Sequence, residues 1–137
     1  MKHIIKIYFP LIFLFFLVFI SCREPLVSSA DERKEELIQG QWVLQSSVPE
    51  REGSITLVFE SGTTRNVVHI IVSGPAGTGE FDFYFRIEDG DLYFLALNDN
   101  NQEIEFLYNI VELTQFNLVL SFAESSGQNV TQTYVRP

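Results

Sequence analysis

From Gln41 to the C-terminus, apolar and polar residues alternate with a period of two, and turn-forming residues interrupt this pattern about every ten residues. Successive side chains of a strand point to opposite faces, so each run has its own inward set. The pattern predicts an all-β domain of eight strands: Gln41–Ser46, Ser54–Glu60, Asn66–Ser73, Glu80–Glu88, Asp91–Asn98, Glu103–Leu113, Asn117–Ala123 and Val130–Arg136.

The dipeptide Asp89-Gly90 separates two of these strands and favours a two-residue type I′ turn. Such a turn fixes the register of the hairpin. A slip by one residue would move the whole inward set into water, so the register is strongly specified. The expected inward pairs are Ile87–Leu92, Phe85–Phe94 and Phe83–Ala96.

Eight sequential antiparallel strands leave two unpaired edges if the sheet stays flat, and closure into a barrel removes both. A sandwich of two four-stranded sheets is the alternative, but simple hairpin connectivity favours an up-and-down barrel. Strand Asn66–Ser73 is apolar on both faces, so we expect the helix described below, or a partner, to cover its outer face.

Bulky aromatic residues dominate the inward face of the expected barrel. A barrel of eight strands is either filled by its side chains or holds one small ligand. These rings would fill much of the interior and leave a shallow pocket near one mouth. The candidate lining residues are Trp42, Phe59, Phe83, Phe85, Phe94, Phe106, Tyr108 and Phe122.

The N-terminus has the organisation of a secretory signal. Lys2 and Lys6 give a basic start, and the apolar run Ile7–Ile20 is shorter than the about 20 residues that a transmembrane helix needs. A small residue, Ser21, precedes Cys22, the single cysteine of the chain. An uncleaved anchor, or a secreted protein with a stray thiol, is the alternative to cleavage at this cysteine.

The stretch Phe19-Ile20-Ser21-Cys22 resembles the bacterial lipoprotein signal, with Phe19 where leucine is commoner. The resemblance implies that Cys22 carries fatty acyl chains such as palmitate and becomes the first mature residue. The expected domains are a signal peptide (1–21), a lipidated tether and helix start (22–36) and a barrel (37–137). Arg23 and Glu24 include no aspartate of the kind that retains lipoproteins at the inner membrane, which favours the outer membrane of the cell envelope.

One short helix is expected before the strands. Ser29 followed by Glu32 forms a capping-box pattern, which predicts a helix over Glu32–Gln39 that ends at Gly40. About two turns are too few to persist alone in water. The helix either closes one end of the barrel or is a solvated charged turn.

The charge of the mature chain excludes some partners. Two of the nine Lys and Arg residues precede Cys22, whereas all 18 Asp and Glu residues follow it, so seven positive against 18 negative charges leave −11. Such a surface repels phosphate backbones, so we expect no nucleic-acid partner. Because lipid would consume the single thiol, no disulfide is available and the core alone must hold the fold.

Three fragments resemble bacterial lipocalin-like domains: Leu37-Ile38-Gln39-Gly40-Gln41-Trp42, Tyr108-Asn109-Ile110 with Leu113-Thr114 and Asn117-Leu118-Val119-Leu120, and Tyr134-Val135-Arg136. The resemblance covers nearly the whole mature domain and implies the same up-and-down barrel. In lipocalins a late arginine packs across the tryptophan that opens the first strand. Arg136 would make this cation–π contact with Trp42, and Gly40 would allow the tight corner between helix and strand.

No constellation of residues argues for catalysis, a metal or a cofactor. His69 lies mid-strand among apolar residues, and a pair of glutamates, Glu103 and Glu105, shares one outward strand face. The glycine-rich stretch Gly74–Gly79 lacks the Gly-Lys-Ser/Thr of a phosphate-binding loop and is expected to be a mobile loop at a barrel mouth. The acidic residues Glu88, Asp89, Asp91 and Asp99 lack a recognisable calcium-ligand spacing. The protein is therefore not expected to be an enzyme.

Two functions remain open. The first is a membrane-anchored lipocalin-like lipoprotein that binds a small apolar or amphipathic ligand in the barrel or at its mouth. The second is a packed barrel that docks another cell-envelope protein through the strand Asn66–Ser73 and the outward-facing Tyr84 and Tyr93.

Overall fold

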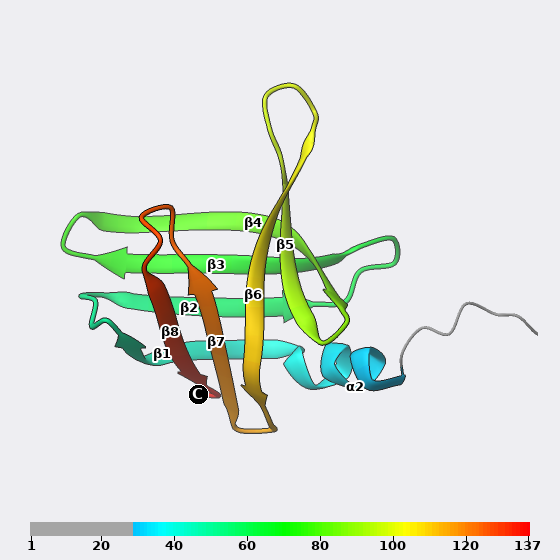
Figure 1. Cartoon of the computed structure of the whole chain (residues 1–137), viewed down its shortest axis with the longest axis horizontal. Coiled ribbons are helices and arrows are strands. Elements are labelled where there is room, and N and C mark those ends of the chain that lie inside the picture. Colours follow the sequence, from blue (N-terminus) through cyan, green and yellow to red (C-terminus); the bar gives the residue numbers. More distant parts are fainter. Residues whose placement is uncertain (1–28) are drawn as a thin grey trace, which may run out of the picture.

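A computed structural model describes residues 29–137, which form a short helix and a closed barrel of eight antiparallel strands in sequential order (Figure 1). This confirms the expected barrel and excludes the sandwich. The lipoprotein signal and Cys22 lie outside the described residues. The elements are α2 (Ser29–Ile38), β1 (Gly40–Val48), β2 (Ser54–Glu60), β3 (Asn66–Gly74), β4 (Gly77–Glu88), β5 (Asp91–Leu97), β6 (Glu103–Leu113), β7 (Asn117–Ala123) and β8 (Asn129–Val135).

The β4–β5 hairpin has the turn that the sequence predicts. Asp89 and Gly90 both have positive φ, 52° and 86°, as a type I′ turn requires. The pairs Ile87↔Leu92 and Phe85↔Phe94 are formed, but the ladder ends at Tyr84↔Leu95. The expected pairing of Phe83 with Ala96 is therefore wrong, because β5 separates from β4 at this point.

The glycine-rich stretch Gly74–Gly79 is not a loop. Gly74 pairs with Gly77 across a two-residue turn, and β4 continues from there in register with β3 as far as Asn66↔Phe85. The positive φ of Gly77, 120°, closes this turn without strain. The glycines mark a tight hairpin, so the expected mobile loop at the barrel mouth is wrong.

Helix α2 closes one end of the barrel, and its last residue, Ile38, is fully buried in the core. The helix starts three residues before the expected Glu32 and is held by the β4–β5 turn. The Asp31 carboxylate accepts hydrogen bonds from the N–H groups of Asp89 (3.1 Å) and Gly90 (2.9 Å), and Lys34 Nζ donates to the Gly90 carbonyl (3.1 Å). The alternative of a solvated turn is thereby excluded.

We expected the helix, or a partner, to cover the outer face of β3, but the helix does not do so. Its contacts are chiefly with β4 and β6, because the corner at Gly40 turns it beneath the end of the barrel. Val67 and Ile71, on the outer face of β3, remain partly exposed. Within residues 29–137, no helix has the length and apolarity needed to cross a membrane.

At the opposite end the barrel opens, because neighbouring strands stop pairing at different heights. Strand β6 pairs with β5 from Glu103 to Tyr108 but with β7 only from Asn109 to Leu113. Residues 77–83 of β4 likewise pair with β3 and not with β5. The outer half of the β5–β6 hairpin therefore stands apart from the rest of the barrel and projects beyond it (Figure 1). We call this open end the mouth.

Candidate functional site

The closed end is built around Trp42 and Arg136. Trp42 is fully buried, and its Nε1 donates a hydrogen bond to the Ile38 carbonyl at 2.7 Å. The Arg136 guanidinium lies over the Trp42 ring, with Cζ 4.1 Å from a ring centroid. The expected cation–π contact is present.

Arg136 also ties the helix to the barrel, which the sequence did not reveal. Its Nη1 and Nη2 donate to the carbonyls of Gln39 (2.8 Å) and Leu37 (2.6 Å) at the end of α2. Carbonyls at a helix C-terminus lack intrahelical donors and attract a cation. Gly40, at φ 100°, makes room for this contact, because a Cβ there would lie 2.8 Å from Arg136 Nη1.

The inward aromatic residues form a continuous series of ring contacts from the core to the mouth. Near the closed end Phe59 meets Phe85 edge to face, with centroids 5.0 Å apart. The next ring toward the mouth is that of Phe94, whose centroid lies 4.7 Å from the Tyr108 centroid. The Tyr108 centroid lies 5.0 Å from that of Phe122. On the other side Phe94 meets Phe83 at 6.1 Å, and Phe83 meets Phe106 at 6.1 Å.

The eight expected lining residues divide into two groups. Trp42, Phe59, Phe85 and Phe94 are buried and packed against other core residues, so the half of the barrel next to the closed end is filled. Phe83, Tyr108 and Phe122 are partly exposed, and Phe106 is 45% exposed. The separation of β6 from β7 accounts for this division, since residues 103–108 of β6 have no neighbouring strand on the β7 side.

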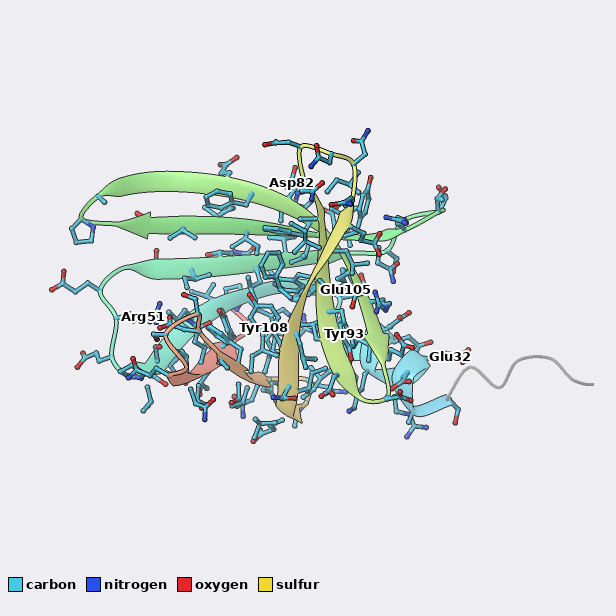
Figure 2. All side chains as sticks on the ribbon, turned by 45° about the horizontal axis from the view of Figure 1, so that its top comes forward. Glu32, Arg51, Asp82, Tyr93, Glu105 and Tyr108 are labelled. Carbon is cyan, nitrogen blue, oxygen red and sulfur yellow. The ribbon has the colours of Figure 1, made fainter. Side chains whose placement is uncertain are left out.

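A half-open pocket of about 350 Å³ occupies this separation, lined by residues 105–109 of β6 and by Phe122 and Ala123 of β7. Tyr108 is one of these lining residues, and Figure 2 shows it on β6 among the side chains that crowd the barrel. Burial raises the pKa of the Tyr108 phenol above its usual 10.0. The phenol is therefore neutral around pH 7 and can donate a hydrogen bond.

A second pocket of about 360 Å³ lies on the outer surface, where the chain before β3 meets β4 and β5. Arg65 lies over the Tyr84 ring at 5.0 Å, and Arg86 over the Tyr93 ring at 4.5 Å. One face of each tyrosine that we expected to dock a partner is thus covered by an arginine. Each of the two glutamates on this face binds one of these arginines: Glu103 lies 3.3 Å from Arg65, and Glu105 lies 2.8 Å from Arg86.

His69 lies on the outer face of β3 between two carboxylates. Its Nδ1 lies 2.6 Å from an Asp82 oxygen, and its Nε2 lies 3.4 Å from a Glu60 oxygen. The hydrogen bond to Asp82 raises the pKa of His69 above its usual 6.5; the Glu60 contact adds to this and burial opposes it. Within residues 29–137, no cluster of three or more His, Cys, Asp or Glu side chains is arranged to hold a metal ion.

The raised pKa of His69 predicts a pH-dependent stability. A group whose pKa is higher in the folded state stabilises the fold below its unfolded pKa and stops doing so as the pH rises through the folded pKa. The melting temperature of the wild type should exceed that of Asp82→Asn most below pH 6.5, and the difference should shrink above it. Thermal melts from about pH 5 to about pH 9 measure this. Glu80→Gln, on the same strand face, is the control, and a difference independent of pH would contradict the assignment.

Comparison with known proteins shows the fold alone. No protein-family model matches the chain, and no curated protein sequence matches it. A de novo designed fluorescence-activating β-barrel is 14% identical with a TM-score of 0.51, over 75% of this chain and 96% of that one. Among other similar structures are a lipocalin-like protein from Bacteroides uniformis (16% identity, TM-score 0.47, 74% and 99% covered) and a mutant of the fluorescent protein UnaG (13%, 0.46, 74% and 97%). The chain is thus a closed eight-stranded β-barrel with a lipocalin-like protein among its structural neighbours.

Proposed function

We propose that the protein binds a small apolar or amphipathic ligand at the mouth of its barrel. The observation that carries this proposal is the series of ring contacts that begins in the packed core and ends in exposed, inward-facing side chains. Phe106 is 45% exposed, Ile104 41% and Phe81 54%, and all three lie on inward strand faces at the mouth. Apolar side chains grouped at a concave opening are typical of ligand sites.

The size and chemistry of the pocket narrow the ligand class. Ligand pockets in proteins span about 300–1,000 Å³, so about 350 Å³ suits a small ligand or one end of a longer chain. The neutral Tyr108 phenol at the pocket can donate a hydrogen bond to a carbonyl or carboxylate oxygen. This combination favours an amphipathic molecule, with its apolar part against Phe106 and Phe122.

A displacement titration with a fluorescent fatty-acid analogue tests the site. Phe106→Ser should weaken binding about tenfold, because it removes a ring that the ligand would bury, worth about 1.5–3 kcal/mol when fully covered. Phe116→Ser is the matched control, since Phe116 is 72% exposed but lies in the β6–β7 turn at the closed end. Equal affinity for the wild type and both variants, or no saturable binding at all, would refute the ligand proposal.

We also propose that Cys22 carries lipid and holds the domain on a membrane, with the outer membrane of the cell envelope favoured. Two or more acyl chains hold a protein firmly, because each buried methylene contributes about 0.8 kcal/mol. Since α2 begins beside the β4–β5 turn at the closed end, the anchor would leave the mouth accessible.

Intact-mass measurement of the mature protein should give a chain that begins at Cys22 and carries acyl adducts. Cys22→Ser should remove the adducts and release the domain from the membrane fraction. A mass without any adduct on the wild-type protein would contradict the anchoring proposal and leave the ligand proposal untouched.

A further inference from the structure

One edge of β6 has no strand beside it. Residues 103–108 pair with β5, from Leu97↔Glu103 to Leu92↔Tyr108, and pairing with β7 begins only at Asn109↔Ser121. No residue in the described part of the chain pairs with the backbone on the other side of this segment. We call that side of residues 103–108 the β6 free edge.

The hydrogen bonding of the β5–β6 hairpin determines which backbone groups the β6 free edge presents. The Asn98 N–H donates to the Gln102 carbonyl at 2.9 Å, so Gln102 directs its backbone toward β5. In an antiparallel sheet alternate residues bond to each neighbouring strand. Glu103, Glu105 and Leu107 therefore direct their N–H and C=O groups away from β5, in the spacing that another strand would match.

The two faces beside this edge differ in chemistry. On the inward face Phe106 and Tyr108 border the pocket that Phe122 completes. On the outward face Glu103 and Glu105 have side chains that are 37% and 47% exposed. Arg65 binds one oxygen of Glu103 (Oε2) and Arg86 one oxygen of Glu105 (Oε1), so the second oxygen of each carboxylate lies outside these pairs. Successive side chains of an added strand would alternate between an aromatic face and an acidic one.

A second copy of this chain fits the edge poorly. If two copies paired antiparallel through the backbone groups of Glu103, Glu105 and Leu107, Glu105 would lie directly opposite Glu105 of the other copy. Like charges in that position are destabilising, and both copies carry a charge of −11 beyond Cys22. The free edge of β4, residues 77–83, is a weaker template because it contains two glycines.

We propose that the β6 free edge binds an extended peptide of alternating apolar and basic residues as an added antiparallel strand. Main-chain hydrogen bonds to Glu103, Glu105 and Leu107 would hold it, as in other strand-addition complexes. Its apolar side chains would cover Phe106 and Tyr108, and its basic side chains would meet the oxygens of Glu103 and Glu105 that Arg65 and Arg86 do not bind. This site takes a polypeptide and goes beyond the small-ligand function, since the small ligand needs no backbone pairing.

The test uses a labelled peptide of alternating lysine and valine, followed by fluorescence anisotropy. In an antiparallel pair, residues directly opposite each other share a face, so each lysine lies opposite an outward-facing β6 residue and directs its own amide toward β6. N-methylation of the lysine amides should weaken binding by more than about tenfold, since about three hydrogen bonds are lost. N-methylation of the valine amides, which face away, should leave the affinity within about twofold. A peptide of alternating glutamate and valine should not bind.

Several outcomes would overturn the proposal. Equal effects of the two methylation patterns would show that binding does not use strand pairing, and loss on valine methylation alone would exclude the antiparallel arrangement. A dimer in sedimentation experiments, with the β6 amides protected from hydrogen exchange, would assign the edge to a second copy. The fatty-acid analogue has no backbone amides, so the two proposals fail separately.

Discussion

Arg136→Ala should lower the free energy of unfolding by about 3 kcal/mol. The substitution removes a cation–π contact worth about 0.5–2 kcal/mol and hydrogen bonds from a charged donor, worth about 1.5–3 kcal/mol each when well formed. Arg136 is partly exposed and these contributions are not additive, so the expected loss is below their sum. Urea denaturation measures it directly, because the fluorescence of Trp42, the single tryptophan, reports on the site of the change.

Two further variants separate the role of Arg136 from a general effect of charge. Arg136→Lys keeps the charge over Trp42 but cannot reach the carbonyls of both Leu37 and Gln39 with a planar fork, so we expect about half the loss. Arg51→Ala removes an exposed arginine paired with Glu124 and should change stability by less than about 1 kcal/mol. If Arg136→Ala is no worse than Arg51→Ala, the closed end is not held as we describe.

Phe94→Ala should be the more damaging change, with an expected loss of 3–5 kcal/mol typical of a buried phenylalanine. Phe94 is 3% exposed, and its ring contacts those of Phe59, Phe83 and Tyr108. Its removal leaves a cavity where the packed half of the barrel meets the open half. Urea denaturation, with Phe116→Ala as the control, measures the loss.

Phe116→Ala removes the same side chain from an exposed turn and should lie within about 0.5 kcal/mol of the wild type. A loss below about 1 kcal/mol for Phe94→Ala would mean that its neighbours close the cavity, or that the interior is not packed around this ring.

The strands and their faces could be predicted because the sequence signals for them are local. Asp89-Gly90 fixes a turn, the alternation then fixes the face of each residue, and the register from Phe85 to Leu92 follows. The contact of Arg136 with Trp42 was expected from resemblance and is present.

What the sequence did not reveal depends on how strands diverge in space. Alternation places Phe83 and Phe106 on the inward face, but it does not specify where β5 leaves β4 or where β6 leaves β7. These separations decide which rings are buried and which are exposed. The filled half and the open half were therefore indistinguishable in the list of inward residues.

Polar contacts between residues far apart in the chain could not be predicted from the sequence either. Asp31 reads as a favourable residue in the first turn of a helix, yet its carboxylate binds the N–H groups of a turn 58 residues away. Similarly, the helix-end carbonyls that Arg136 binds are 97 and 99 residues distant in the chain. Hydrogen bonds at such separations leave no periodic signal.

An NMR titration of amide signals with the fatty-acid analogue tests most directly whether the open half of the barrel is a binding site. We expect saturable shifts grouped at Phe83, Phe106, Tyr108 and Phe122, with little change around Trp42 at the closed end. Saturable shifts grouped instead at the outward Tyr84 and Tyr93, or no saturable shift at any concentration, would contradict this expectation.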